Sequence, residues 1–248
     1  SLYESMDIHS SSFFFHKQVY EDLKNQKFQS EFTGIELIRI MIIGPGSGEE
    51  LISILLFFHD IFKEKKYSIY SLDRYKKNMR KFLTSPVFHL KLLNNIPQKY
   101  HKYLDIKEVT FSVKQNIYSN VIFTSDNFLG NRSFYNYDFI FCQNVLTHFK
   151  KSIRDEFINK ITYSMKVKGI LITENEHIEL SKDRDFFSYL DAPSKKIFRL
   201  LRKKKYSEFK LIPLKKNIEK LGDENLNNLK ESLVIKNKNL LIENESLK

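Results

Sequence analysis

The sequence predicts an α/β protein with an open sheet. Apolar stretches of strand length alternate with helical patterns through residues 35–205. The first stretch, Ile38–Ile43, runs straight into a glycine-rich turn and then an apolar helix at Leu51–Phe58. Each predicted strand also ends in polar residues. Because ligands of open α/β sheets bind outside the carboxyl ends of the strands, we expect a site along that edge.

The composition is that of a globular chain whose surface is rich in lysine. The chain has 248 residues, 42% of them hydrophobic, which suffices for one large domain and an appendage. The net charge is +11, but most lysines are scattered, apart from a cluster at Arg202–Lys205. This favours a solvated surface over a nucleic-acid site. The sequence also has no zinc-binding pattern, so we predict no metal.

Two features bear on the cellular location. The longest apolar stretch, Leu51–Phe62, contains His59 and Asp60 and is too short to span a bilayer, so we predict no membrane insertion. No signal peptide is recognisable. The single cysteine, Cys142, excludes an intramolecular disulfide and favours a reducing compartment. We therefore expect a cytoplasmic protein.

The glycine-rich turn at residues 44–50 reads Gly-Pro-Gly-Ser-Gly-Glu-Glu. Its glycines are Gly44, Gly46 and Gly48. Glycine at these positions permits positive φ and lets a ligand approach the backbone closely. The helix that follows offers free N–H donors to an anionic group. The alternative is an ordinary strand-to-helix turn without a ligand.

The residues around the last glycine narrow the class of ligand. No lysine follows Gly48, which excludes a P-loop. Glu49 and Glu50 follow it instead, and acid at this point repels phosphate and suits a cationic ligand such as S-adenosylmethionine. Ser47 and Glu50 also have the spacing of a capping box, which predicts that the helix begins at the turn.

The second predicted strand, Tyr67–Asp73, ends in an acid. An acidic residue about 20 residues after a glycine turn typically binds ribose hydroxyls. The alternative is that Asp73 caps a helix at Arg74–Phe82, and both roles can coexist.

The rest of the chain completes the predicted alternation. A serine run at Ser10–Ser12 is expected to cap an N-terminal helix within residues 1–34, and residues 84–119 read as an inserted subdomain. Lys168–Gly169 reads as a turn before the fifth strand. The remaining predicted elements are strands at Val121–Asp126, Tyr137–Asn144 and Ile170–Thr173, a helix at Ile153–Met165, and a last strand within residues 189–200.

The composition changes in residues 206–248, which form a linker and tail. Leucine recurs every seven residues there, at Leu226, Leu233, Leu240 and Leu247. This spacing predicts a short coiled coil and a homodimer, and the alternative is a disordered polar tail.

With these segments placed, the chain resembles the CheR family of chemotaxis-receptor methyltransferases, in the form found in multidomain sensor proteins. The stretches that carry the resemblance occur in the family's order. Ser11–Phe15 resembles the motif T-x-F-F-R, Gly44–Glu50 resembles G-C-S-T-G-E-E, Asp73 the acid of A-T-D, Asn127–Leu129 N-L-L, Phe141–Leu146 C-R-N-V-L, Glu174–Glu176 G-x-S-E, and Asp191–Leu200 the final strand.

The resemblance implies a Rossmann-like S-adenosylmethionine-dependent methyltransferase fold with a small β-subdomain, which would be the insertion at residues 84–119. It implies S-adenosylmethionine as methyl donor and glutamate side chains of an acidic helical receptor as acceptor. It also implies that the cofactor is bound by the glycine turn and by Ser11, Glu49, Asp73, Asn127, Phe128 and Asn144.

Departures from the family pattern lie on the acceptor side. The arginine of T-x-F-F-R is Phe15 here, or His16 with a shift of one residue, and the arginine of C-R-N is Gln143. Arg39 stands where the family has an active-site arginine and is the candidate catalytic residue; the alternative is a surface cation.

Three hypotheses follow. The chain is a protein-glutamate O-methyltransferase, a weakly active or inactive S-adenosylmethionine-binding sensory module, or a scaffold without cofactor.

Overall fold

The computed structural model describes residues 12–25, 35–62, 66–78, 86–190 and 193–201. All of them belong to one compact unit, Ser1–Lys204. Ser11 and the predicted coiled coil of residues 206–248 lie outside the described residues.

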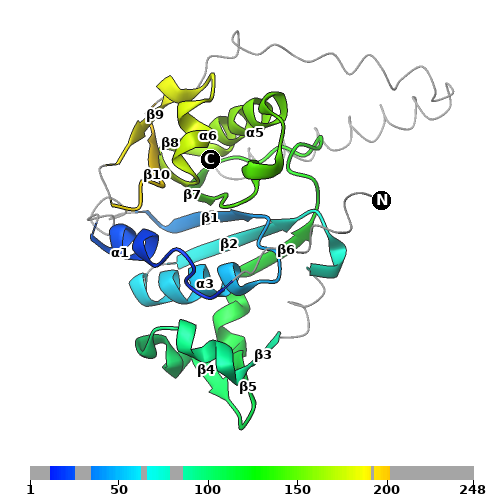
Figure 1. Cartoon of the computed structure of the whole chain (residues 1–248), viewed down its shortest axis with the longest axis vertical. Coiled ribbons are helices and arrows are strands. Elements are labelled where there is room, and N and C mark those ends of the chain that lie inside the picture. The colour runs from blue at the N-terminus through cyan, green and yellow to red at the C-terminus, as the bar shows by residue number, and fades with distance from the viewer. Residues whose placement is uncertain (1–11, 26–34, 63–65, 79–85, 191–192, 202–248) are drawn as a thin grey trace, which may run out of the picture. The chain divides into compact units, whose positions relative to one another are not determined.

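A seven-stranded sheet forms the centre of the described part of the chain (Figure 1). Its strands are β1 (Leu37–Ile43), β2 (Lys66–Asp73), β6 (Val121–Ser125), β7 (Tyr137–Phe141), β8 (Met165–Ile172), β9 (Phe187–Tyr189) and β10 (Ile197–Leu200). Their order across the sheet is β6-β2-β1-β7-β8-β10-β9. The pairs from β6 to β8 are parallel, and β10 is antiparallel to both of its neighbours. The predicted open α/β sheet is confirmed.

Strand β1 shows why this sequence forms a sheet covered on both faces. Ile38, Ile40 and Ile42 pack in one apolar cluster with the helix α3 (Glu49–Ile61). The alternate residues Met41 and Ile43 pack in a second cluster with α5 (Lys151–Ser164). Because successive side chains of a strand point to opposite faces, a continuous apolar run is what a central strand between two helical layers requires.

Residues 86–120 form a second, smaller sheet in the stretch expected to be an insertion. Its strands are β3 (Val87–His89), β4 (Leu104–Ile106) and β5 (Thr110–Val113), in the antiparallel order β3-β5-β4. The short helices η1 (Leu90–Asn95), η2 (Gln98–Tyr103) and η3 (Gln115–Asn120) surround it, and α3 contacts η2 and η3 (Figure 1).

The N-terminal segment joins the two sheets. Phe13 packs edge-to-face on Phe88 of the small sheet at 5.0 Å, and Phe14 stacks on Tyr100 at 5.1 Å. The expectation that serines cap the following helix is wrong, because α1 (Lys17–Asn25) begins after a turn at residues 13–16. The buried Asp22 on α1 accepts a hydrogen bond of 2.8 Å from the backbone N–H of Ser194, 172 residues away.

The predicted turn at Lys168–Gly169 is also wrong, because both residues lie inside β8. The register against β7 shifts there, and Lys168 has a φ of 68°. A Cβ on Gly169 would lie 2.8 Å from the carbonyl oxygen of Lys166. The two residues therefore form a β-bulge that only glycine can complete.

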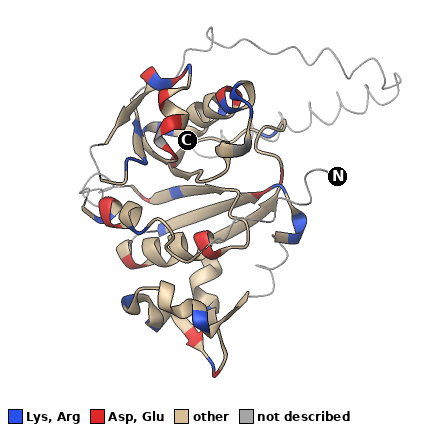
Figure 2. Cartoon of the chain, viewed as in Figure 1, with Lys and Arg blue, Asp and Glu red and all other residues tan. Residues whose placement is uncertain are grey.

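Four strands and several short helices were not predicted individually. They are β9, the small sheet's strands, η4 (Leu146–His148), α6 (Asn175–Glu179) and η5 (Arg184–Phe186). Figure 2 shows basic and acidic residues spread over the helices, strands and loops of the described part, as the scattered lysines predict. No helix of that part is both long and apolar enough to cross a bilayer.

Candidate functional site

The glycine turn leaves β1 in a backbone conformation that favours glycine at three positions. The φ angles of Gly44, Gly46 and Gly48 are 69°, 58° and 106°. The N–H of Gly44 donates to the carbonyl oxygen of Leu72 at 2.8 Å, which ties the turn to the end of β2. A Cβ on Gly44 would meet Val145 at 2.8 Å, whereas a Cβ on Gly46 would have no atom within 4 Å. Gly46 therefore leaves open space at the turn for a ligand.

The helix after the turn begins differently from the prediction. Gly48, rather than Ser47, is the N-cap of α3, and no side chain caps it. The hydroxyl of Ser47 donates instead to Glu49 Oε2 at 2.5 Å. The expected capping box of Ser47 and Glu50 is therefore wrong, because the left-handed Gly48 takes the capping position. Glu49 is half-buried in the first turn of α3, beside the glycines.

The position of the turn in the sheet is that of a ligand site. Strand β1 pairs with β2 on one side and with β7 on the other, so the strand order reverses between β1 and β7. In open α/β sheets such a switch point opens the crevice where ligands bind. Gly44–Gly48 follow β1 and Asn144 follows β7, so both flank this crevice.

Asp73 ends β2 next to the glycine turn, and its side chain is only 4% exposed. Its Oδ1 accepts the N–H of Tyr75 at 2.7 Å, and its Oδ2 accepts the side-chain amide of Asn78 at 3.1 Å. Asp73 thus holds the residues that follow β2, but it does not cap a helix that starts at Arg74 as the alternative predicted, because Arg74 and Tyr75 are not helical. Since each carboxylate oxygen has two lone pairs, the group can also accept hydroxyl donors of a ligand.

Asn127 and Phe128 follow β6, and their side chains differ in burial. The exposed Asn127 accepts the N–H of Leu129 through its Oδ1 at 3.1 Å. The Phe128 ring is buried against Phe134 and Phe157, with ring centroids 5.6 and 4.5 Å apart. The structure therefore places the Phe128 side chain in the core and leaves its backbone beside Asn127 as the part available to a ligand.

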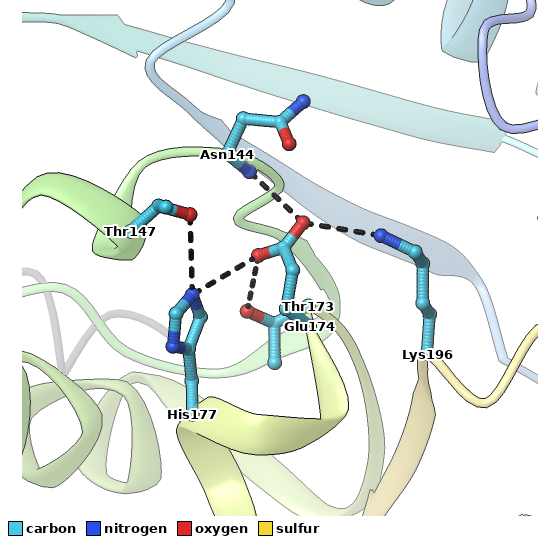
Figure 3. Close-up of polar contacts among 6 residues, drawn as sticks. All are labelled: Asn144, Thr147, Thr173, Glu174, His177 and Lys196. Atoms are coloured by element: carbon cyan, nitrogen blue, oxygen red, sulfur yellow. Dashed lines mark hydrogen bonds and ion pairs between the residues drawn. The ribbon is translucent and has the colours of Figure 1, made fainter.

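A polar cluster gathers at the ends of β7 and β8, and we call it the Glu174 cluster. It contains Asn144, Thr147, Thr173, Glu174, His177 and Lys196 (Figure 3). Glu174 is its centre.

The carboxylate of Glu174 is held from several elements. Its Oε1 accepts the backbone N–H of Asn144 at 3.1 Å and lies 3.3 Å from the ammonium of Lys196. Its Oε2 is 3.5 Å from Nε2 of the buried His177. Asn144 has a φ of 58°, and its own side chain is exposed and points away from Glu174 (Figure 3). The cluster therefore leaves the Asn144 amide free to face the crevice.

Burial lowers the pKa of two histidines, His177 in this cluster and His16, so both are mainly neutral at neutral pH. Burial lowers the pKa of His177 and outweighs the opposing effect of Glu174. The pKa of His16 is lowered first by burial and next by the charge of Lys196. His16 Nε2 and His177 Nδ1 are buried without a hydrogen-bond partner among the described residues. Neither histidine therefore adds a positive charge to this edge.

Glu50, the second residue of α3, is an unusual acid. Burial raises its pKa to about 8, the charge of Glu174 adds to this, and Lys196 opposes it. Its Oε1 is buried and has no hydrogen-bond partner among the described residues. A helix N-terminus favours the ionised form, but burial prevails here and Glu50 is largely protonated at neutral pH.

Replacing Glu50 with glutamine should make the protein more stable above about pH 5. Between the ordinary carboxyl pKa of 4.5 and about 8, the folded chain holds a proton that the unfolded chain has released, so stability falls as pH rises. Glu50 keeps partial exposure, and we expect a gain of about 2 kcal/mol at pH 8, under half of what the pKa difference alone implies. Urea unfolding at pH 4, 6 and 8 measures it.

At pH 4 the gain should vanish, because Glu50 is then protonated in both states. A gain that is equal at pH 4 and pH 8 would show that Glu50 is not buried as an acid.

The N-terminal motif has Phe15, or His16 with a shift of one residue, where the family's motif has arginine. Phe15 is 60% exposed and contacts His16 edge-to-face at 4.7 Å. His16 is half-buried and responds to the charges of both Lys196 and Glu174. His16, rather than the exposed Phe15, is therefore the residue of this motif whose pKa is affected by the charges of the Glu174 cluster.

The structure does not bring Arg39 to this edge. Arg39 is exposed in the first half of β1, opposite Ser68 of β2. It lies five positions before Gly44, and each position of a strand adds about 3.3 Å. Its backbone N–H donates to Asp138 at 2.8 Å, near the start of β7. The surface-cation alternative describes this placement, because the parallel strands carry the site at their other end.

The residues brought together fit S-adenosylmethionine. Gly46 leaves space that a side chain would fill, Asp73 offers carboxylate oxygens, and Glu49 adds negative charge that suits a sulfonium. The described residues contain no group of three or more acids, histidines or cysteines arranged to hold a metal. Buried Cys142 has a pKa raised by burial and is an inert core residue.

Sequence reasoning overlooked Glu50, His177 and Lys196 as site residues. Glu174 was recognisable as a polar strand end, and Lys196 follows a turn at Pro193. Their meeting depends on the antiparallel pairing of β8 with β10, which no local pattern reveals.

Known proteins are similar to this chain in sequence. The family model described as CheR methyltransferase, SAM binding domain, matches residues 9–196. A curated relative, the uncharacterized 104.1 kDa protein in the hypE 3' region of Rhodobacter capsulatus, is 20% identical over 160 residues. That alignment covers 62% of this chain and 17% of the relative, so the chain spans a small part of the relative's length.

Several solved methyltransferases are similar to the chain. A SAM-dependent methyltransferase from Methanosarcina mazei has a TM-score of 0.35 and 18% identity, covering 68% of this chain and 74% of the other. The N-methyltransferase NodS of Bradyrhizobium japonicum has a TM-score of 0.39 and 9% identity, covering 74% and 98%. PKMT2 of Rickettsia typhi in complex with AdoHcy has a TM-score of 0.37 and 17% identity, covering 56% and 20%.

Proposed function

The chain belongs to the CheR methyltransferase family, and from this membership we propose that it methylates glutamate side chains of a helical, receptor-like signalling protein. Membership confirms two predictions, the Rossmann-like methyltransferase fold and S-adenosylmethionine as the cofactor. The observation that carries the proposal is the convergence of Gly46, Asp73 and Asn144 on the switch point of the sheet.

The proposed chemistry asks little of the protein's acids and bases. When bound, S-adenosylmethionine supplies a methyl group activated by its sulfonium. A glutamate carboxylate is already ionised at neutral pH, so no residue has to remove a proton. The residues of the site then have to align the acceptor and exclude water. The neutral His16 and His177 suit this reaction, because neither is required as a base.

The partner and compartment belong to the same proposal. An acidic helical bundle suits a chain of net charge +11. The buried Cys142 suits a reducing cytoplasm. The leucine seam in residues 206–248 supports a homodimer.

A second candidate function is a sensory module that binds the cofactor and transfers its methyl group weakly or not at all. The observation that favours it is Phe15, which is exposed where the family's motif has arginine. This candidate predicts cofactor binding without turnover.

We expect the protein to transfer labelled methyl from S-adenosylmethionine to a helical receptor fragment that contains glutamate. The matched fragment with glutamine at the same positions should accept none, because an amide oxygen is a far weaker nucleophile than a carboxylate. Phe15→Arg should change the rate by less than about twofold, since an exposed side chain does not reach the acceptor. Radioactivity in the separated fragment measures transfer.

Binding of S-adenosylhomocysteine is measured on the same preparation by calorimetry. Binding without transfer to the glutamate fragment would favour the sensory module. Equal labelling of both fragments would contradict glutamate as the acceptor.

A further inference from the structure

Lys196 brings a positive charge to the carboxyl edge of the sheet. It directly precedes β10, and its carbonyl oxygen accepts the N–H of Thr173 at 3.0 Å. The start of the antiparallel β10 therefore lies beside the end of β8. Two strands, β7 and β8, separate β10 from β1, so Lys196 lies on the β7 and β8 side of the switch point.

The ammonium of Lys196 is held in place but not enclosed. Its Nζ is 3.3 Å from Glu174 Oε1, and Glu174 in turn accepts the backbone N–H of Asn144. The two side chains are 21% and 14% exposed, so both remain partly open to solvent. Through Glu174 the ammonium is tied to the residue that follows β7 at the crevice (Figure 3).

The other residues considered as sources of positive charge at this site do not supply it. Arg39 lies in the first half of β1, and Phe15 carries no charge. His16 and His177 have pKa values lowered by burial. Lys196 is the basic side chain whose charge acts on His16, Glu50 and Glu174 together.

We propose that Lys196 binds a ligand carboxylate at this edge, in place of the arginine that the family pattern expects at Phe15 or His16. The proposal rests on the proposed function, which brings two carboxylates here. One is the methionine carboxylate of the cofactor, and the other is the side chain of the acceptor glutamate. Both present the same chemistry to an ammonium group.

The pair with Glu174 leaves room for this contact. An ammonium has three N–H donors, and the structure gives Lys196 one side-chain partner among the described residues. The distance of 3.3 Å is longer than the 2.7–2.9 Å typical of a strong charge-assisted bond. Glu174 therefore orients the ammonium, and the remaining donors are available to a ligand.

The experiment compares Lys196→Met, Lys196→Arg and a control. Lys166→Met is matched to the first, because Lys166 makes an ion pair of 2.8 Å with Asp138 at the opposite end of the same sheet. Calorimetry measures the Kd of S-adenosylhomocysteine, which has the carboxylate, and of 5'-methylthioadenosine, which lacks it. Methyl transfer to the glutamate fragment and the melting temperature are measured on the same proteins.

If Lys196 binds the cofactor carboxylate, Lys196→Met weakens S-adenosylhomocysteine by about ten- to a hundredfold and leaves 5'-methylthioadenosine unchanged. If Lys196 binds the acceptor, both Kd values stay unchanged, and kcat/KM for the fragment falls by about ten- to a hundredfold. In either event Lys196→Arg restores most of the loss, and Lys166→Met has no such effect.

Two results would overturn the proposal. One is an equal weakening of both nucleosides together with a lower melting temperature, which would mean a structural role. The other is no change in either Kd or in transfer. Failure of the proposed function is separate, since an unaltered protein that binds S-adenosylhomocysteine but labels no fragment still allows the comparison of the two nucleosides.

Discussion

Alanine in place of Gly44 should lower the melting temperature by roughly 5–15 °C. The new Cβ would lie 2.8 Å from Val145 and would impose a φ of +69° on a residue with a side chain. The left-handed conformation costs about 1–2 kcal/mol and the overpacking about 1–3 kcal/mol. For a domain of this size each kcal/mol corresponds to roughly 2–4 °C. Calorimetric melting measures the loss.

Gly46→Ala is the informative partner of this variant. Its φ of +58° carries the same backbone cost, but no atom lies within 4 Å of the new Cβ. We expect a smaller loss of stability, about 1–2 kcal/mol. We also expect binding of S-adenosylhomocysteine to weaken by roughly tenfold or more, because the methyl group fills space that the cofactor approaches.

Val145→Ala separates the two contributions at Gly44. Added to Gly44→Ala, it removes the clash and should recover part of the melting temperature, while the backbone cost remains. If Gly46→Ala bound S-adenosylhomocysteine as tightly as the unaltered protein, the open space beside Gly46 would not belong to the cofactor site.

Asp73→Ala should weaken S-adenosylhomocysteine by about ten- to a hundredfold or more. The expectation is that its carboxylate accepts both ribose hydroxyls, and each hydrogen bond to a charged group contributes roughly 1.5–3 kcal/mol. The substitution also removes the bonds that Asp73 makes to Tyr75 and Asn78, so part of the effect is structural.

Asn78→Ala is the control for that structural part. It removes the 3.1 Å bond to Asp73 and leaves the carboxylate in place, so affinity should stay within about twofold. Isothermal calorimetry on the three proteins decides the matter, and equal affinities of Asp73→Ala and the unaltered protein would refute the ribose role.

The sheet was predictable because its signals are local. The apolar run Ile38–Ile43 and the glycines after it define β1 and its turn within a dozen residues or so. Asp73 was recognised from its place at the end of the next strand, and the structure puts it beside Gly44 through the Leu72 carbonyl. Patterns of this kind can be recognised from residues that are close together in the sequence.

The individual strands of the small sheet and the polar cluster could not be predicted from the residues, for a different reason. Strands of three or four residues, such as β3 and β5, are too short to show alternation. Glu174 meets Asn144 and Lys196 across 30 and 22 residues. Those meetings depend on strand pairing, which is a property of the whole sheet. Phe128 shows the converse, since a motif placed it in the site while packing placed its ring in the core.

The hydrogen bond between Asp22 and Ser194 sets an order of events during synthesis. Helix α1 emerges from the ribosome early, but the partner of its buried carboxylate is made 172 residues later. At 5–20 residues per second this delay is roughly 10–30 s. Over that interval Asp22 has only water and neighbouring side chains as partners. The bond to Ser194 is therefore among the last contacts of α1 to form during synthesis.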